Sequence, residues 1–165
     1  MSKSIDIKNL PQLWASIKDA FEWDGSWRDI YILNTSSRDW DAVLAELKNE
    51  SYNAKFFLGG EQQEHILSSY DSLKKSPNKP IGMLSVDIEG VQYNAHFFTD
   101  EELEFDIDPR QVTETNFPQV CDFLVMLSRI TGKECLLTDE NWINFQHVPP
   151  ILKINAAKNV ATLGS

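Results

Sequence analysis

The stretch MLSVDIEGVQYNAHFFTDEELEFDID, residues 83–108, decides the fold of this chain. Its apolar residues recur at every second position, which is typical of strands that bury one face and leave the other in water. We therefore predict three consecutive antiparallel strands over residues 83–88, 91–98 and 103–107. Together they form a three-stranded meander.

The turn between the first two strands predicts their register. Glu89-Gly90 is a tight-turn signal, and a two-residue loop there places apolar residues opposite each other on alternate rungs. The predicted apolar pairs are Ile88 with Val91, Val86 with Tyr93, and Leu84 with Ala95. The polar rungs pair Asp87 with Gln92, Ser85 with Asn94, and Met83 with His96. Matching apolar rungs in the second hairpin puts Phe97 opposite Leu103 and Ala95 opposite Phe105, with residues 98–102 as the loop. This register also places His96 beside Glu104, and Asn94 beside Asp106.

Outside the meander, apolar residues spaced by three and four predict helices. These helices cover residues 10–23, 37–49, 61–75 and 117–131, with Asn116 as a cap and Gly132 as a stop. Shorter apolar runs predict strands over residues 30–33, 55–58 and 133–138, and the contiguous run 30–33 indicates a strand covered on both faces. We expect an α+β fold, a mostly antiparallel sheet packed against about three to four helices.

Length and composition predict a single globular domain over residues 1–165, with residues 155–165 as a loose tail. No apolar run reaches the roughly 18 residues that a membrane-spanning helix needs, and the N-terminal residues lack the long apolar segment of a secretory signal. The two cysteines, Cys121 and Cys135, sit among apolar residues. Such residues are typical of buried free thiols, so we expect a reducing, cytoplasmic environment.

Charge is distributed unevenly along the chain. The net charge is −10, and the thirty residues between Lys79 and Arg110 contain no lysine or arginine. The eight acids in this stretch are Asp87, Glu89, Asp100, Glu101, Glu102, Glu104, Asp106 and Asp108. The excess of negative charge disfavours direct binding to nucleic acid, which needs basic patches, and to anionic membranes. It favours a basic protein partner.

Four of these acids alternate with buried positions of the third strand and predict a column of carboxylates on its wet face. A solvated sheet face that aids solubility is the simplest interpretation. The alternative is a docking face, because like charges this close repel each other and a partner rich in lysine and arginine would relieve them. Its predicted contacts are Asp87, Glu89, Glu102, Glu104, Asp106, Asp108 and His96. Three tryptophans, Trp23, Trp27 and Trp40, lie at the borders of predicted elements, and one or two of them could add an exposed aromatic anchor.

Two other function classes stay open. His96 with Glu104 and Asp106 could serve a small enzyme or a ligand-binding domain as a general base or pH sensor. The chain could also be a structural or oligomer-forming domain whose interface lies elsewhere; its oligomeric state is not predicted. No nucleotide-binding, hydrolase or zinc-protease motif occurs, and Pro109 stands where a calcium-binding loop needs glycine. We therefore expect no catalytic residues, no metal and no cofactor.

In its size, its acidity and its lack of catalytic motifs, the whole chain resembles the small acidic bacterial immunity proteins that neutralise toxins. The resemblance assigns no role to an individual residue. It implies a cytoplasmic inhibitor that covers a basic surface on a toxin, often a nuclease.

Overall fold

A single antiparallel sheet runs through the computed structural model, which describes residues 3–75, 78 and 80–164. The sheet has ten strands in the order β1-β10-β9-β8-β2-β7-β6-β5-β3-β4. The strands are β1 (Lys3–Asp6), β2 (Arg28–Leu33), β3 (Lys55–Leu58), β4 (Glu61–Gln62), β5 (Gly82–Ile88), β6 (Val91–His96), β7 (Glu102–Ile107), β8 (Cys135–Asp139), β9 (Leu152–Asn155) and β10 (Val160–Leu163). The fold is α+β, as the sequence predicts.

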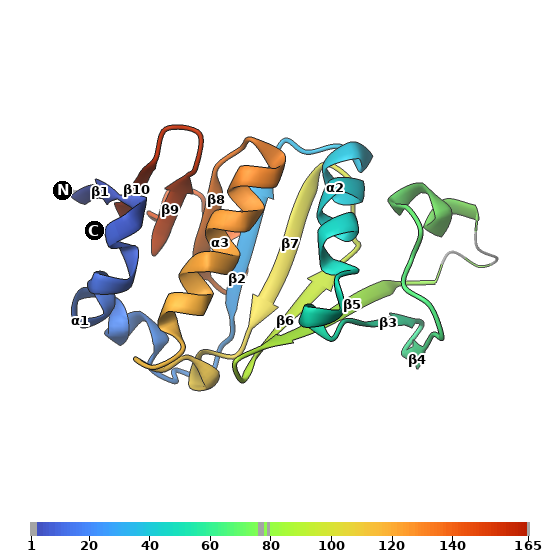
Figure 1. Ribbon diagram of the computed structural model, residues 1–165, viewed down its shortest axis with the longest axis horizontal. Coiled ribbons are helices and arrows are strands. Elements are labelled where there is room, and N and C mark those ends of the chain that lie inside the picture. Colours follow the sequence, from blue (N-terminus) through green and yellow to red (C-terminus); the bar gives the residue numbers. More distant parts are fainter. Residues whose placement is uncertain (1–2, 76–77, 79, 165) are drawn as a thin grey trace.

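Two helices cover one face of this sheet, as Figure 1 shows: α2 (Ser37–Leu47) and α3 (Phe117–Thr131). Short α1 (Trp14–Ile17) lies near the two chain ends, which meet where β1 pairs with β10 (Figure 1). Six 3₁₀ helices complete the described chain: η1 (Ile7–Leu13), η2 (Lys18–Phe21), η3 (Glu50–Tyr52), η4 (Tyr70–Lys75), η5 (Pro109–Gln111) and η6 (Trp142–Asn144). None of the described helices is long and apolar enough to cross a membrane.

The helix ends follow their sequence signals in part. Asn116 precedes α3 as predicted, but its side chain makes no capping hydrogen bond, because its Oδ1 accepts the N–H of Thr113 at 2.8 Å. Gly132 closes α3 with a φ of 70°, a left-handed conformation that glycine adopts without strain. At the start of α2, Asp39 Oδ2 accepts the backbone N–H of Ser36 at 3.2 Å. The same carboxylate accepts a bond from Lys133 Nζ at 3.0 Å, which joins α2 to the segment after α3.

The predicted register of the meander is confirmed in its first hairpin, where all six predicted pairs occur. In the second hairpin Ala95 lies opposite Phe105 and Asn94 opposite Asp106, as predicted. The predicted pairs Phe97–Leu103 and His96–Glu104 are not part of the ladder between β6 and β7. The meander is only part of the sheet, because β2 pairs along the other edge of β7, from Arg28–Ile107 to Leu33–Glu102. Strand β7 therefore lies in the interior of the sheet, between β2 and β6.

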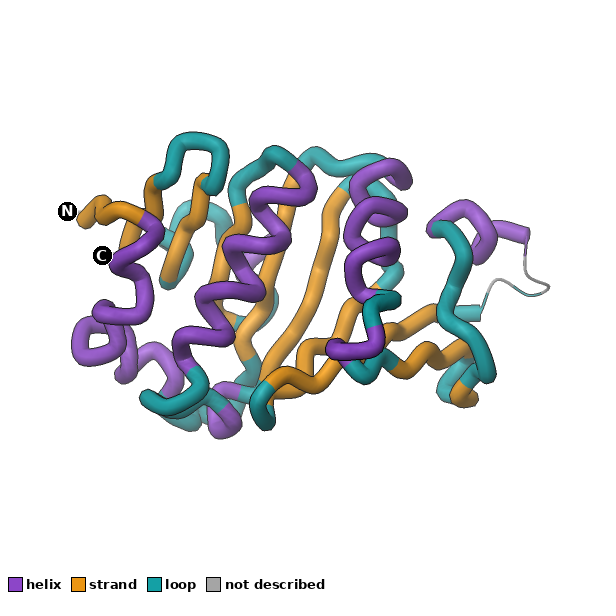
Figure 2. Tube along the Cα trace, viewed as in Figure 1, coloured by secondary structure: helices purple, strands orange, loops and turns teal. Residues whose placement is uncertain are grey.

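One helix prediction was correct only in part, and another was wrong. The segment 10–23 is helical as far as Phe21, but it forms η1, α1 and η2 in place of one α-helix. Pro11 lies inside η1 and has no N–H to donate to a regular α-helical ladder. The segment 61–75 begins with β4, which pairs with β3 through Leu58–Glu61, and only Tyr70–Lys75 is helical. Figure 2 shows the loop that separates these two pieces.

The prediction of a loose tail over residues 155–165 was also wrong for its described part. Strand β10 lies between β1 and β9 and pairs with both along four residues. Ala161 is fully buried in the main core, so the end of the chain is held by a ladder on each side and by apolar packing. Ser165 lies outside the described residues.

A pair of neighbouring substitutions tests the position of β10. Ala161→Asp should lower the free energy of unfolding by about 3–5 kcal/mol, because it buries an uncompensated charge. Thr162→Asp should cost much less, because Thr162 is half-buried on the other side of the strand. Urea denaturation measures both, and equal stabilities for the two variants would mean that this segment does not pack as described.

Candidate functional site

Strands β5, β6 and β7 turn their polar side chains away from α2 and α3. Leu103, Phe105 and Ile107 of β7 are buried in the main core, so the alternate residues of β7 and their cross-strand partners point to the opposite side of the sheet. We call this surface the open face. It consists of Met83, Ser85, Asp87, Gln92, Asn94, His96, Glu102, Glu104 and Asp106.

An aspartate–histidine pair lies on the open face. His96 Nε2 donates to Asp106 Oδ2 at 2.6 Å, and Asn94 Nδ2 donates to Asp106 Oδ1 at 2.9 Å. The pKa of His96 is raised, chiefly by its hydrogen bond to Asp106. The sequence predicts His96 beside Glu104. In the structure the imidazole bonds to Asp106, its diagonal neighbour on β7, which lies within range of a long side chain. Phe98, which is 61% exposed, stacks on the His96 ring at 5.3 Å between centroids.

Glu104 belongs to a second group, which includes residues that sequence analysis missed. Tyr31 Oη lies 3.0 Å from Glu104 Oε1 and 3.1 Å from Asp29 Oδ2. Asp29 Oδ2 also accepts the backbone N–H of Asn141 at 2.8 Å. Burial raises the pKa of Asp29, of Glu104 and of Tyr31. The signal that could have revealed this group is Asp29 itself, a charged residue beside the contiguous apolar run 30–33.

Trp142 explains why Tyr31 is buried on the face opposite the helices. Its ring lies 6.2 Å from the Tyr31 ring, and together with Leu136 the two form a second, small core. The segment that carries η6 therefore covers β2 and β8, which confirms that β2 is enclosed on both faces. The cover brings Asn141 to Asp29 at the border of the open face.

Asp108 does not contribute free charge to the open face. Arg110 binds its carboxylate through Nε at 3.0 Å and Nη2 at 2.9 Å, and this hydrogen bonding lowers the pKa of Asp108. The guanidinium also lies 3.8 Å from the centre of the Trp23 ring. Trp23 is 46% exposed, but its face is occupied by this cation, so it is not a free aromatic anchor.

The remaining predicted contacts lie toward the ends of the strands. Asp87 is exposed near the β5–β6 turn, where its Oδ1 accepts the N–H of Gly90 at 3.3 Å. Glu89 is exposed within that turn and adopts a φ of 51°. Glu102 is half-buried at the start of β7, and its pKa is raised by burial and then by Glu101. The structure thus groups Glu102, Glu104, Asp106 and His96 on one surface and places Asp87 and Glu89 at its edge.

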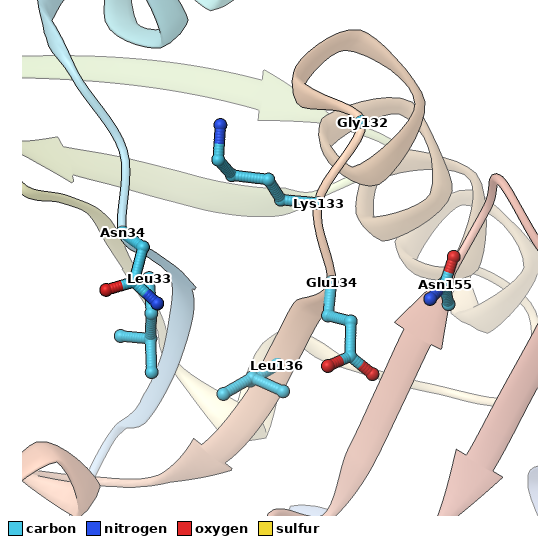
Figure 3. Close-up of a pocket in the computed structure, with 7 residues that line it drawn as sticks. All are labelled: Leu33, Asn34, Gly132, Lys133, Glu134, Leu136 and Asn155. Atoms are coloured by element: carbon cyan, nitrogen blue, oxygen red, sulfur yellow. The ribbon is translucent and has the colours of Figure 1, made fainter.

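Enclosed space lies elsewhere on the molecule. A pocket of about 360 Å³ opens where β2, β8 and β9 meet the end of α3, and its lining includes Asn34, Lys133, Glu134 and Asn155 (Figure 3). Three further pockets also lack His96, Glu104 and Asp106 among their lining residues. Among residues 3–75, 78 and 80–164, no group of three or more His, Cys, Asp or Glu side chains is arranged to hold a metal ion.

No protein-family model, curated protein or solved structure matches this chain.

The His96–Asp106 contact predicts a change in titration. Asp106→Asn should lower the pKa of His96 toward its ordinary value of 6.5, because the charge-assisted hydrogen bond is lost. The stability that the pair adds is fully present below about pH 6.5 and is lost as the pH rises through the raised pKa of His96. An NMR titration of the imidazole protons measures this shift. Asp87→Asn, which removes an equal charge from the same face, should leave the His96 titration nearly unchanged; an equal effect of both variants would contradict the specific pairing.

Proposed function

We propose that this protein is a non-catalytic binding domain whose open face docks a basic protein partner. The observation that carries this proposal is the position of Glu102, Glu104 and Asp106. All three extend from one strand to the same side of the sheet, and each is partly accessible to solvent.

Electrostatics favours a cationic partner for such a surface. Carboxylates two residues apart on a strand lie about 7 Å from each other. This distance is within the Debye length of roughly 8 Å at physiological salt, so their fields add. A face with one sign of charge speeds the encounter with an oppositely charged surface and disfavours acidic competitors.

An exposed aromatic side chain supplies apolar contact beside the charges. Phe98 continues β6 past His96 and stacks on it with an angle of 4° between the ring planes. Aromatic residues, phenylalanine among them, are enriched in protein–protein interfaces. We therefore include Phe98 with Asp87, Glu89, Glu102, Glu104, Asp106 and His96 as contacts of the partner. Asp108 is left out because Arg110 already neutralises it.

A toxin-neutralising immunity protein that acts in the cytoplasm is the specific form of this function that we propose. The chain resembles such proteins in size and acidity. A nuclease holds phosphates with lysine and arginine side chains, which carry the charge opposite to that of the open face. A face of carboxylates could occupy such a groove in place of the nucleic acid.

The second candidate is a small enzyme or ligand-binding domain that uses His96 with the nearby carboxylates. It is favoured by the polar group of Asp29, Tyr31, Glu104, Asp106 and His96, since perturbed pKa values often gather at functional sites. The openness of this surface counts against it, because small molecules are usually bound in concave pockets.

Charge reversal tests the docking proposal. The double variant Asp87→Lys, Glu102→Lys should weaken capture of the partner from a lysate of the source organism at least about tenfold, because like charges then face each other across the interface. The matched control is Glu50→Lys with Glu64→Lys, which changes the net charge equally at exposed positions outside the open face.

Affinity measured at low and high salt completes the experiment. Binding through the open face should weaken as salt rises, because salt screens exposed charges. If binding is insensitive to salt, or if the control variant loses as much affinity as the open-face variant, the docking proposal is wrong.

A further inference from the structure

We propose that Asp29 and Glu104 together retain one proton at neutral pH, shared through Tyr31, and that its release switches the charge at the centre of the open face. The role of this switch in controlling partner binding rests on the proposed function. The shared proton does not, because it follows from the geometry within the chain.

The geometry of the tyrosine hydroxyl favours a second proton. Tyr31 Oη lies within hydrogen-bond distance of both Glu104 Oε1 and Asp29 Oδ2, at 3.0 and 3.1 Å. A phenolic hydroxyl has one hydrogen to donate, whereas an ionised carboxylate can only accept. If both carboxyl groups were ionised, one of the two contacts would bring lone pairs together without a hydrogen. A carboxylic acid on either side completes the chain, with one carboxyl donating to Oη and Oη donating to the other.

The surroundings of this pair disfavour two negative charges. Asp29 is 6% exposed and Tyr31 is 1% exposed, so the charges would be poorly hydrated. The acidic neighbours are Asp106, which lies opposite Asp29, Glu102, which shares a strand with Glu104, and Glu140 in the segment that covers β2.

His96 is the cationic group facing Glu104 from β6, but its Nε2 is already bound to Asp106. Asn141 donates its backbone N–H to Asp29 and so helps to stabilise one charge on the pair. The N–H of Asn141 and the nearby charge of His96 suit a pair that carries one negative charge. Burial raises the pKa of both carboxyl groups, and because they share one hydroxyl the proton belongs to the pair.

Release of the proton changes the open face without a change of fold. As the pH rises, the pair gains a second negative charge, and His96 loses its positive charge when the pH passes its raised pKa. Both changes make the open face more negative as the pH rises. A basic partner would therefore bind more tightly as the pH rises, provided that its own positive charge is retained.

Infrared spectroscopy of the isolated chain tests the shared proton. Carboxyl groups in water are ionised at pH 7, so a carbonyl stretch from a protonated carboxyl at about pH 7 reports a group whose pKa is raised. The wild-type chain should show this band and lose it as the pH rises. Glu104→Gln and Asp29→Asn should each abolish it, because the amide donates to Oη and the remaining carboxylate can ionise. Glu101→Gln, which removes an exposed carboxyl next in the chain to β7, should retain it.

The outcomes separate this proposal from the docking proposal, because no partner is present in the cuvette. Absence of the band from the wild-type chain at about pH 7, or its persistence in both Glu104→Gln and Asp29→Asn, would overturn the shared proton. Failure of the charge-reversal experiment would overturn docking and leave the band unaffected.

Stability at different pH values provides a second readout if one variant folds poorly. A carboxyl with a raised pKa stabilises the fold fully below its unfolded pKa, and this stabilisation is lost as the pH rises through the folded pKa. Between about pH 5 and pH 8, the folding equilibrium constant of the wild-type chain should therefore fall relative to that of Glu104→Gln, by about tenfold for each unit by which the pKa is raised. Parallel curves for the two proteins would contradict the proposal.

Discussion

The pairing of β7 with both of its neighbours is the constraint on which the rest of the structure depends. Leu103, Phe105 and Ile107 are each 1% exposed or less, and they alternate with three carboxylates. A shift of one residue in the register would bury those carboxylates under the helices and expose the apolar side chains. That exchange is so unfavourable in free energy that β7 takes a single register. The positions of β2 and β6 along the sheet are set by their pairing with β7.

The same constraint places acidic side chains on an interior strand of the sheet. Because β7 is an interior strand, its carboxylates have cross-strand neighbours on both sides. Glu104 meets Tyr31 on one side, and Asp106 meets Asn94 and His96 on the other. Asp87, near the end of β5, is exposed to water. The open face thus combines a rim of hydrated charges with a centre in which protons and hydrogen bonds reduce the repulsion.

Local patterns predicted the elements whose two faces differ. The β5–β6 hairpin was predicted residue by residue because its turn, its alternation and its cross-strand pairs all agree. The prediction of a helix over 61–75 failed because apolar spacing alone cannot distinguish a helix from a loop whose apolar residues dip into the core, as Leu67 does. The prediction of a loose tail over 155–165 failed because a segment as short as β10 becomes a strand only when the strands on both sides of it, β1 and β9, are present.

The amino-acid sequence by itself determined the acidic stretch, the register of the meander and the face on which Glu102, Glu104 and Asp106 lie, because these follow from a period of two and a turn. Only the tertiary structure decided which acids stay free. Arg110 folds back onto Asp108, and β2 delivers Asp29 and Tyr31 to Glu104 from more than seventy residues away in the chain. Contacts at such separation depend on the order of strands in the sheet, and no local pattern encodes that order.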